Sequence, residues 1–257
     1  MKRGYYFLAP SLPPLILRQK PELSFVSFVQ RLELSLSKKD MAKTRVLRLF
    51  VDLSNIRSLF LEEQIDSRGN LNEKELDEAL LVHAGLPEYV FTFFSQFNTM
   101  SDRLRHFSGV LALFFQEEAK KQTGFLRQYL VFEREVRLVL LGLRAKRLKR
   151  DLVKELQFED PTDPFVAHLL SQKDQEDYEP PFEYRDLKEQ LHSCYKDPLA
   201  ELETLNQYRF FKLEEMVEKE LFSIDRILCY MAQLMIVEDM CELDAQRGYQ
   251  ILDTFKS

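Results

Sequence analysis

Residues 49–61 read Leu-Phe-Val-Asp-Leu-Ser-Asn-Ile-Arg-Ser-Leu-Phe-Leu, and residues 129–141 read Tyr-Leu-Val-Phe-Glu-Arg-Glu-Val-Arg-Leu-Val-Leu-Leu. Each stretch has the spacing of an apolar helix, and each is interrupted by a short polar cluster that ends in an arginine. The two stretches begin 80 residues apart. Repetition of this kind indicates an architecture built from copies of one helical unit. The alternative is a chance likeness, because any two amphipathic helices share this periodicity.

The composition also predicts long helices. The chain of 257 residues holds only 7 glycines and 10 prolines, so few residues interrupt its periodic segments. Hydrophobic residues make up 45% of the chain, with 21 Phe and no Trp, which is ample for a phenylalanine-rich core. No stretch shows the alternation of a strand convincingly. The expected fold is therefore all-α, with long packed helices in two or more repeated bundles.

Three parts are predicted along the chain. Residues 1–20 should form an extended N-terminal arm, because its adjacent prolines fix φ and remove hydrogen-bond donors. Residues 21–100 should form a first helical bundle, and residues 101–257 a second bundle or bundles. Within the latter, the acidic, proline-ended stretch 172–181 is the expected mobile loop.

Capping signals predict where helices begin. Ser37 is followed three residues later by Asp40, and Asn72 by Glu75, so each pair has the spacing of a capping box. The turn between these two helices is predicted at residues 66–70.

Later in the chain, long helices are predicted over 103–121 and 123–156, after a polar turn at 98–102. Asp197 and Pro198 have the pattern of an N-cap followed by the first helical residue.

Charge and motifs argue against several classes of function. The net charge of −6 argues against a general nucleic-acid binder, which needs a basic field to attract phosphates. The glycines are scattered and form no phosphate-binding loop, and no nucleophile motif stands out. We therefore expect no enzyme and no cofactor. The three cysteines lack CxxC spacing and are expected to be free thiols in a reducing cytoplasm: Cys194, Cys229 and Cys241.

Two stretches faintly resemble metal sites. Residues 66–72 resemble a calcium loop, but Arg68 and Leu71 stand where an oxygen ligand and a glycine are needed. Glu189 and His192 have the spacing of half a di-iron motif, without a second copy. No metal is expected, and a metal-dependent bundle enzyme is kept as an alternative.

The polar residues of the two opening stretches are candidate site residues. Asp52, Asn55 and Arg57 belong to the first stretch, and Glu133 and Arg137 to the second. Glu133 precedes Arg137 by four residues, so an ion pair within the helix is plausible. Arg57 lies five residues from Asp52, so its partner is expected on another helix. The interpretation is a structural polar clamp between helices, with a partner-binding hot spot as the alternative.

A basic run near the end of the predicted helix 123–156 adds three candidates, Arg144, Arg147 and Arg150. Cations at this end of a helix interact favourably with its dipole, so a solvated helix end is one interpretation. The functional interpretation is docking to an acidic partner surface or to lipid headgroups. The longest apolar stretch, residues 227–237, is too short for a membrane span, which needs roughly 20 residues.

Several stretches together resemble a known family. They are the Tyr-Tyr-Phe-Leu-Ala-Pro-Ser-Leu-Pro start at 5–13 and the segments 51–57, 69–71, 86–89, 125–133 and 230–238. Over most of its length the chain resembles a bacterial family that accompanies V-type ATP synthases. That family is distantly similar to the funnel-shaped central-stalk protein of these enzymes, which is built of repeated helical bundles and seats the rotating shaft on the membrane rotor ring.

The resemblance implies a non-catalytic rotor-stalk subunit of a V-type ATP synthase or ATPase, serving proton or sodium ion transport. Its partners would be other ATPase subunits, namely the central shaft and the membrane rotor ring, and not nucleic acid. It would be cytoplasmic, peripheral on the inner face of the cell membrane through these protein partners.

This chain departs from the funnel-shaped stalk protein and its relatives in three ways. It is shorter than a protein of three bundles, Glu238-Asp239-Met240 stands where the family often has Trp, and the loop 172–181 fits poorly. These departures concern the partner contacts more than the fold. The alternative function is a helical adaptor that binds a partner helix and is unrelated to the ATPase.

Overall fold

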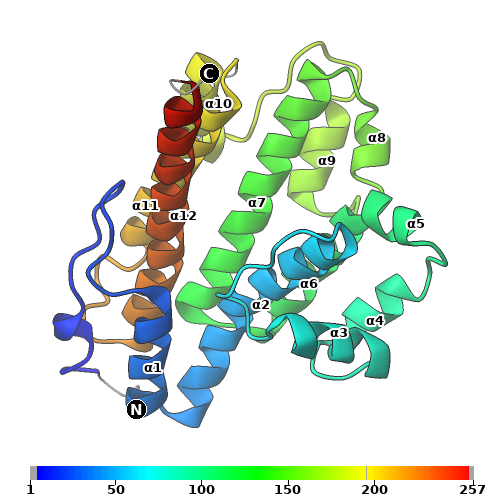
Figure 1. The fold of residues 1–257 in the computed structure, drawn as a ribbon. Coiled ribbons are helices and arrows are strands. Elements are labelled where there is room, and N and C mark those ends of the chain that lie inside the picture. The colour runs from blue at the N-terminus through cyan, green and yellow to red at the C-terminus, as the bar shows by residue number, and fades with distance from the viewer. Residues whose placement is uncertain (1–4, 195, 255–257) are drawn as a thin grey trace. The chain divides into compact units, whose positions relative to one another are not determined.

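The computed structural model describes residues 5–194 and 196–254, with side chains as far as residue 243 (Figure 1). Within these residues it contains twelve α-helices, two 3-10 helices and no strand, so the all-α prediction is confirmed. Among the described residues, no helix combines the length and the apolar character needed to cross a membrane.

The chain divides into two compact units. Unit 1 is Met1–Thr44 together with Glu189–Ser257, and unit 2 is Arg45–Lys188. This division differs from the predicted bundles 21–100 and 101–257. The physical reason is that an early helix packs against the last one, so the two ends of the chain belong to one unit. Sequence periodicity carries no information about such long-range pairing.

Unit 1 is built around the last two helices. α11 (Pro198–Met216) and α12 (Ile224–Thr254) pack side by side, and α1 (Phe25–Ser35) packs on α12. The rings of Phe28 and Tyr230 lie 5.1 Å apart between α1 and α12. The first amide of α1, from Phe25, donates to the Glu238 carboxylate at 2.8 Å.

The N-terminal arm is tied to unit 1. Tyr5 is buried, its hydroxyl donates to Asp40 at 2.6 Å, and its amide donates to the carbonyl of Phe222 at 2.7 Å. The Tyr230 hydroxyl donates to the carbonyl of Pro13 at 3.0 Å. The arm is less extended than predicted, because η1 (Ala9–Ser11) interrupts it. The prediction for residues 1–4 lies outside the described residues.

Unit 2 is organised by the pair α6 (Phe107–Lys121) and α7 (Gly124–Arg147), which pack along each other. In Figure 1, α7 is the long green helix with shorter helices beside it. α4 (Glu88–Phe94) and α5 (Met100–Arg105) pack on α6, whereas α8 (Leu152–Glu155) and α9 (Pro164–Ser171) pack on α7. The remaining elements are α2 (Lys38–Phe60), which crosses from unit 1, α3 (Glu73–Val82), η2 (Phe182–Tyr184) and α10 (Arg185–Cys194), which crosses back.

Phenylalanine forms much of the core of unit 2. Phe50 of α2 lies 5.9 Å from Phe114 and 5.8 Å from Phe115 of α6, measured between ring centroids. Both α6 rings are almost fully buried. Aromatic pairs in this range add about 0.5–1.5 kcal/mol to the free energy gained by burial alone. The phenylalanine-rich core predicted from composition is therefore present here.

Two predicted helix starts are confirmed in detail. The Asn72 side chain accepts from the Glu75 amide at 3.0 Å, and the Glu75 side chain accepts from the Asn72 amide at 2.9 Å, which completes the capping box of α3. Asp197 caps α11 with Pro198 as its first residue. Both capping side chains satisfy amides that a helix start leaves without partners.

The helix predicted over 123–156 is shorter in the structure. α7 ends at Arg147, and α8 begins only at Leu152. Between them Lys149 adopts φ +52°, a left-handed conformation that ends a helix. The polar turn predicted at 98–102 is partly helical, because Thr99 caps α5. Both differences arise in very short segments, where local periodicity predicts little.

Candidate functional site

A buried carboxylate on α2 organises the turn before α3. Asp52 accepts from the side-chain amide of Asn70 at 2.7 Å and from the backbone amide of Leu71 at 3.1 Å. One turn further along α2, Asn55 bonds both backbone groups of Asp66, each at 2.8 Å. We call Asp52, Asn55, Asp66 and Asn70 the Asp52 cluster. It fixes the turn predicted at residues 66–70 against the side of α2.

Glycine is required in this turn because the backbone passes so close to α2. A Cβ atom on Gly69 would lie 2.5 Å from Asp52 Oδ1 and 3.0 Å from Asn55 Nδ2. Arg48, one turn before Asp52 on α2, donates to the carbonyls of Arg68 and Gly69 and thereby holds the same turn. The turn is therefore a closely fitted part of unit 2.

The electrostatics of the Asp52 cluster depend on burial. Burial raises the pKa of Asp52 above its ordinary value, although hydrogen bonds from Asn70 and Leu71 and the charge of Arg48 act in the opposite direction. Arg57 takes no part in this cluster, since it is exposed in the last turn of α2. No hydrogen bond or ion pair joins its side chain to another residue that the structure describes. Of the first three candidates, the structure brings Asp52 and Asn55 together and leaves Arg57 outside.

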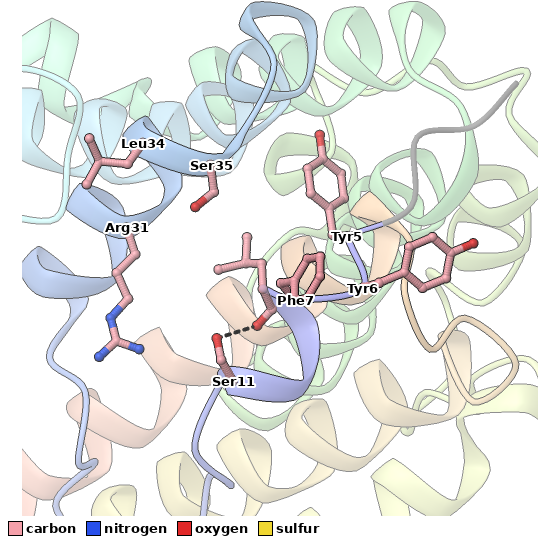
Figure 2. A pocket seen from close by; sticks show the side chains of 8 residues that line it. Tyr5, Tyr6, Phe7, Ser11, Arg31, Leu34 and Ser35 are labelled. Atoms are coloured by element: carbon pink, nitrogen blue, oxygen red, sulfur yellow. Dashed lines mark hydrogen bonds between the residues drawn. The ribbon is translucent and has the colours of Figure 1, made fainter.

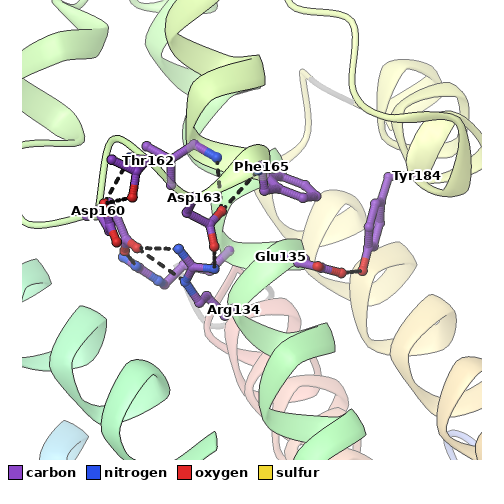
Figure 3. Close-up of polar contacts among 10 residues, drawn as sticks. Arg134, Glu135, Asp160, Thr162, Asp163, Phe165 and Tyr184 are labelled. Atoms are coloured by element: carbon purple, nitrogen blue, oxygen red, sulfur yellow. Dashed lines mark hydrogen bonds and ion pairs between the residues drawn. The ribbon is translucent and has the colours of Figure 1, made fainter. Parts of the chain in front are cut away.

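A second polar cluster ties α7 to the segment that follows α8. Arg134 contacts Glu159 and Asp163, each at 3.0 Å, and Arg137 pairs with the second oxygen of Glu159. We call Arg134, Arg137, Glu159 and Asp163 the α7 clamp, and Figure 3 shows Arg134 beside Asp163. Asp163 also caps α9, because its side chain accepts from the amides of Phe165 and Val166. The clamp therefore fastens the start of α9 to the middle of α7.

The charges of the α7 clamp are mutually paired around Glu159, which is buried, whereas the other three side chains are partly buried. Burial lowers the pKa of Arg137, and its pairing with Glu159 only partly offsets that effect. Burial would also lower the pKa of Arg134, but the carboxylates of Glu159 and Asp163 raise it above its ordinary value. The guanidinium of Arg137 lies 5.9 Å from the ring centroid of Phe115, within cation–π range.

Sequence reasoning found only part of this clamp. Arg137 was a candidate, but its observed partner is Glu159, 22 residues later, whereas Glu133 was the predicted one. The ion pair within the helix between Glu133 and Arg137 stays a prediction. Arg134, Glu159 and Asp163 were missed. Asp163 could have been found, since it precedes Pro164 as Asp197 precedes Pro198, and both aspartates cap helices.

A further hydrogen bond joins η2 to α7. The Tyr184 hydroxyl of η2 donates to Glu135 at 2.6 Å, as Figure 3 shows. Burial raises the pKa of Glu135. Side chains along one stretch of α7 thus hold several segments that come later in the chain.

The basic run at the end of α7 divides between two roles. Lys146 donates to the backbone carbonyls of Gln172, Lys173 and Gln175 at 2.6, 2.8 and 2.6 Å. It therefore holds the segment that directly follows α9 against the end of α7. The three candidates Arg144, Arg147 and Arg150 are exposed at the same end of α7, and Arg150 lies 3.5 Å from Glu155.

The acidic loop 172–181, predicted to be mobile, is held at several points in addition to Lys146. Tyr178 is fully buried, and a Cβ on Gly142 of α7 would lie 2.6 Å from its ring. Lys188 pairs with Asp177 and Glu179 at 2.8 Å each. These contacts show an anchored loop.

Both clusters position the backbone. Their charged and polar atoms are directed at one another or at turns and helix starts within unit 2. Among the described residues, no group of three or more His, Cys, Asp or Glu side chains is arranged to hold a metal ion. Among the candidate residues, Arg57 and the three arginines at the end of α7 are exposed.

Comparison with known proteins places the chain in a family. It belongs to the family described as "Protein of unknown function (DUF2764)", which matches residues 1–257. It is 29% identical to an uncharacterized protein of Chlamydia trachomatis serovar D over 254 residues, covering 96% of each chain. It is 30% identical to an uncharacterized protein of Chlamydia pneumoniae over 255 residues, covering 97% of this chain and 96% of the relative. No solved structure matches.

Proposed function

We propose that this member of the DUF2764 family is a non-catalytic rotor-stalk subunit of a V-type ATP synthase or ATPase, coupling the rotating shaft to the membrane ring. The family resemblance of segments such as 5–13 and 125–133 motivates the proposal. The α7 clamp is the observation that carries it, because a coupling element needs helices that cannot slide past one another under load.

The mechanical argument rests on how the clamp resists shear. A close-packed helix pair resists compression, but apolar surfaces specify their register only through shape. The paired charges of Arg134, Arg137 and Glu159 add a directional restraint, since sliding α7 would leave a buried charge without its partner. Breaking such a pair by removing one partner costs about 3–5 kcal/mol. The aromatic contacts between α2 and α6 pack the same unit from another side.

Contacts with other subunits would use the surface. Arg144, Arg147 and Arg150 present a basic patch at one end of α7, which complements an acidic surface on the shaft or the ring. Charges at the rim of an interface mainly set the association rate and the choice of partner. This location would make the chain peripheral to the membrane through protein contacts.

Affinity purification tests the proposed function. A tagged chain, produced at its native level, is isolated from mildly solubilised native membranes, and bound proteins are quantified by mass spectrometry. Recovery of shaft and ring subunits in a fixed ratio to the chain is expected. Isolation of an intact ATPase from the same membranes without this chain, and of the chain without ATPase subunits, would contradict the proposal.

Matched variants locate the contact within this assay. Changing Arg144, Arg147 and Arg150 together to Glu should reduce recovery of the ATPase. The control changes three other exposed arginines, Arg45, Arg105 and Arg127, to Glu. If both variants lose ATPase recovery equally, the effect is due to net charge, and the basic patch is not the contact.

One observation favours the alternative, a helical adaptor unrelated to the ATPase. Unit 1 displays aromatic side chains beside a surface hollow, which is a feature of partner-binding proteins in general. The same purification separates the two functions, because an adaptor would recover a defined partner that is not an ATPase subunit.

A further inference from the structure

Unit 1 carries a hollow of about 420 Å³ between the N-terminal arm and α1 (Figure 2). Arg31, Leu34 and Ser35 of α1 form one side, and the arm forms the other. The lining residues from the arm are Tyr5, Tyr6, Phe7, Leu8 and Ser11. The volume lies within the usual range of ligand and side-chain pockets, about 300–1,000 Å³.

The arm presents its aromatic side chains from a fixed backbone. Tyr5 and Leu8 are buried on either side of Tyr6 and Phe7, which are 67% and 93% exposed. The Tyr5 hydroxyl and amide are both hydrogen-bonded, and the Ser11 hydroxyl donates to the carbonyl of Leu8 at 2.8 Å. Holding a phenylalanine in water on an anchored turn forgoes the free energy that its burial would release.

Apolar surface continues around the hollow. Leu34 is 91% exposed on the facing side of the hollow. The ring of Tyr6 lies 5.2 Å from the ring of Phe222, which is itself partly exposed. Contiguous apolar surface rimmed by polar groups marks interaction sites on folded proteins.

Arg31 supplies the one charge among the described residues that line the hollow. It is exposed, and no ion pair or hydrogen bond joins its side chain to another described residue. Burial raises the pKa of Tyr230 to about 12, and the positive charge of Arg31 acts in the opposite direction. An arginine beside exposed aromatic side chains is the composition of an interface hot spot, and its fork of donors fits a carboxylate.

We propose that this hollow binds a segment of a partner protein that places apolar side chains on Phe7 and Leu34 and a carboxylate on Arg31. Charge complementarity selects this occupant, since the hollow offers one positive charge inside an apolar surround. A membrane surface is a poorer fit, because recognition of anionic lipid uses clusters of about 4–8 basic residues. The proposal goes beyond the proposed function, because it specifies a contact surface on unit 1 whichever protein supplies the segment.

Site-specific photo-crosslinking tests the hollow in the full-length chain within its own cells. A benzoylphenylalanine replaces Phe7, and in a parallel control it replaces Leu81, an exposed leucine on α3 that is outside the hollow. After irradiation, mass spectrometry identifies what is attached. The expected product is one protein segment with an Asp or Glu within about one helical turn of the attachment point, formed at position 7 and not at position 81.

Charge variants then test the role of Arg31. Arg31→Glu should lower the cross-link yield at position 7 by about tenfold, and Arg31→Lys should preserve most of it. Arg127→Glu, which changes an exposed arginine of α7, is the matched control and should leave the yield unchanged. Circular dichroism and the unfolding midpoint verify that each variant is folded.

The outcomes separate the two proposals. A cross-link to a non-ATPase protein with the expected carboxylate would support the hollow and contradict the stalk function. Recovery of ATPase subunits without any cross-link at position 7 would support the stalk function and contradict the proposal for the hollow. Attachment to lipid, to a second copy of this chain, or to a segment without a carboxylate would overturn the proposal for the hollow. So would a yield that Arg31→Glu leaves unchanged.

Discussion

The Asp52 cluster and the α7 clamp arise from similar stretches of sequence, yet they stabilise unit 2 in different ways. In the Asp52 cluster a single buried carboxylate is held mainly by neutral donors from a turn 18 or 19 residues away. In the α7 clamp two arginines share carboxylates that lie 22 to 29 residues further along the chain. The first cluster shapes a turn, and the second joins separate helices.

The arginines that end the two polar patterns show the difference most clearly. Arg57 and Arg137 each follow a buried residue, Ile56 and Val136. Arg57 nevertheless faces solvent, whereas Arg137 is directed into the clamp. Apolar spacing therefore determines that both stretches are helices, but the partner available in space determines what each polar residue does.

The largest effect is expected from removing the shared carboxylate of the clamp. Glu159→Ala leaves Arg137 buried without its partner and removes one of two partners of Arg134, which should cost about 3–5 kcal/mol of unfolding free energy. Chemical denaturation monitored by circular dichroism measures this. Glu155→Ala, which removes a more exposed pair with Arg150, should cost less than about 1 kcal/mol. Equal costs for the two variants would show that the clamp contributes no more than a surface pair.

A smaller effect is expected from crowding the Asp52 cluster. Gly69→Ala places a methyl group against Asp52 and Asn55, so a loss of about 1–3 kcal/mol is expected from overpacking. Ser67→Ala changes an exposed residue of the same turn and should stay within about 0.5 kcal/mol of the unmodified protein. The same denaturation experiment decides. A tolerated alanine at position 69 would mean that the turn is not closely fitted to α2.

The pH dependence of Asp52 should distinguish its cluster further. Because burial raises the pKa of Asp52 in the folded protein, the folded state retains a proton that the unfolded chain releases near its ordinary pKa of about 4. The contribution of this group to stability therefore falls as the pH rises from about 4 through the raised pKa. Asp52→Asn cannot titrate, so its unfolding free energy relative to the unmodified protein should improve over this range. Asp77→Asn, at an exposed position on α3, controls for the loss of one charge. If the difference in unfolding free energy between Asp52→Asn and the unmodified protein stays constant with pH, burial does not raise the pKa of Asp52.

The smallest effect is expected at Arg57. Arg57→Ala should change the unfolding free energy by less than about 0.5 kcal/mol, because the side chain is exposed. Arg137→Ala leaves Glu159 buried with one partner fewer and should cost several times more. Thermal unfolding of the two variants side by side measures the contrast. Similar losses would mean that the two arginines are equivalent after all, as a strict repeat requires.

The fold class and several local features could be predicted from the sequence because they depend on neighbouring residues. The few breakers predicted long helices, and the spacing of Asn72 and Glu75 predicted the start of α3. The clamp could not be predicted as a whole, because Arg134 and Glu159 meet only after the chain has passed through α8. The segments that make up unit 1 were not predicted for the same reason, because α1 packs on α12, which lies at the other end of the sequence.

The candidate site shows the same limit. Asp52 and Asn55 stand out in the sequence as polar positions inside an apolar pattern, but their hydrogen-bond partners are in a turn that the pattern does not identify. For the basic run the charge was predictable, but α7 ends at Arg147, before Arg150. The role of Lys146 depends on where the carbonyls of residues 172, 173 and 175 lie. The exposed aromatic side chains beside Arg31 gave no periodic signal, because a turn presents them.

The central claim, that this chain couples rotation without catalysing a reaction, is tested most directly by comparing two activities of the ATPase. Membrane vesicles are prepared from cells that lack the chain and from cells in which it has been restored. ATP hydrolysis and ATP-driven ion transport are then measured in the same preparation. The account predicts that loss of the chain lowers ion transport much more than hydrolysis, and that restoring it recovers the ratio. An unchanged ratio of transport to hydrolysis in vesicles without the chain would contradict the account.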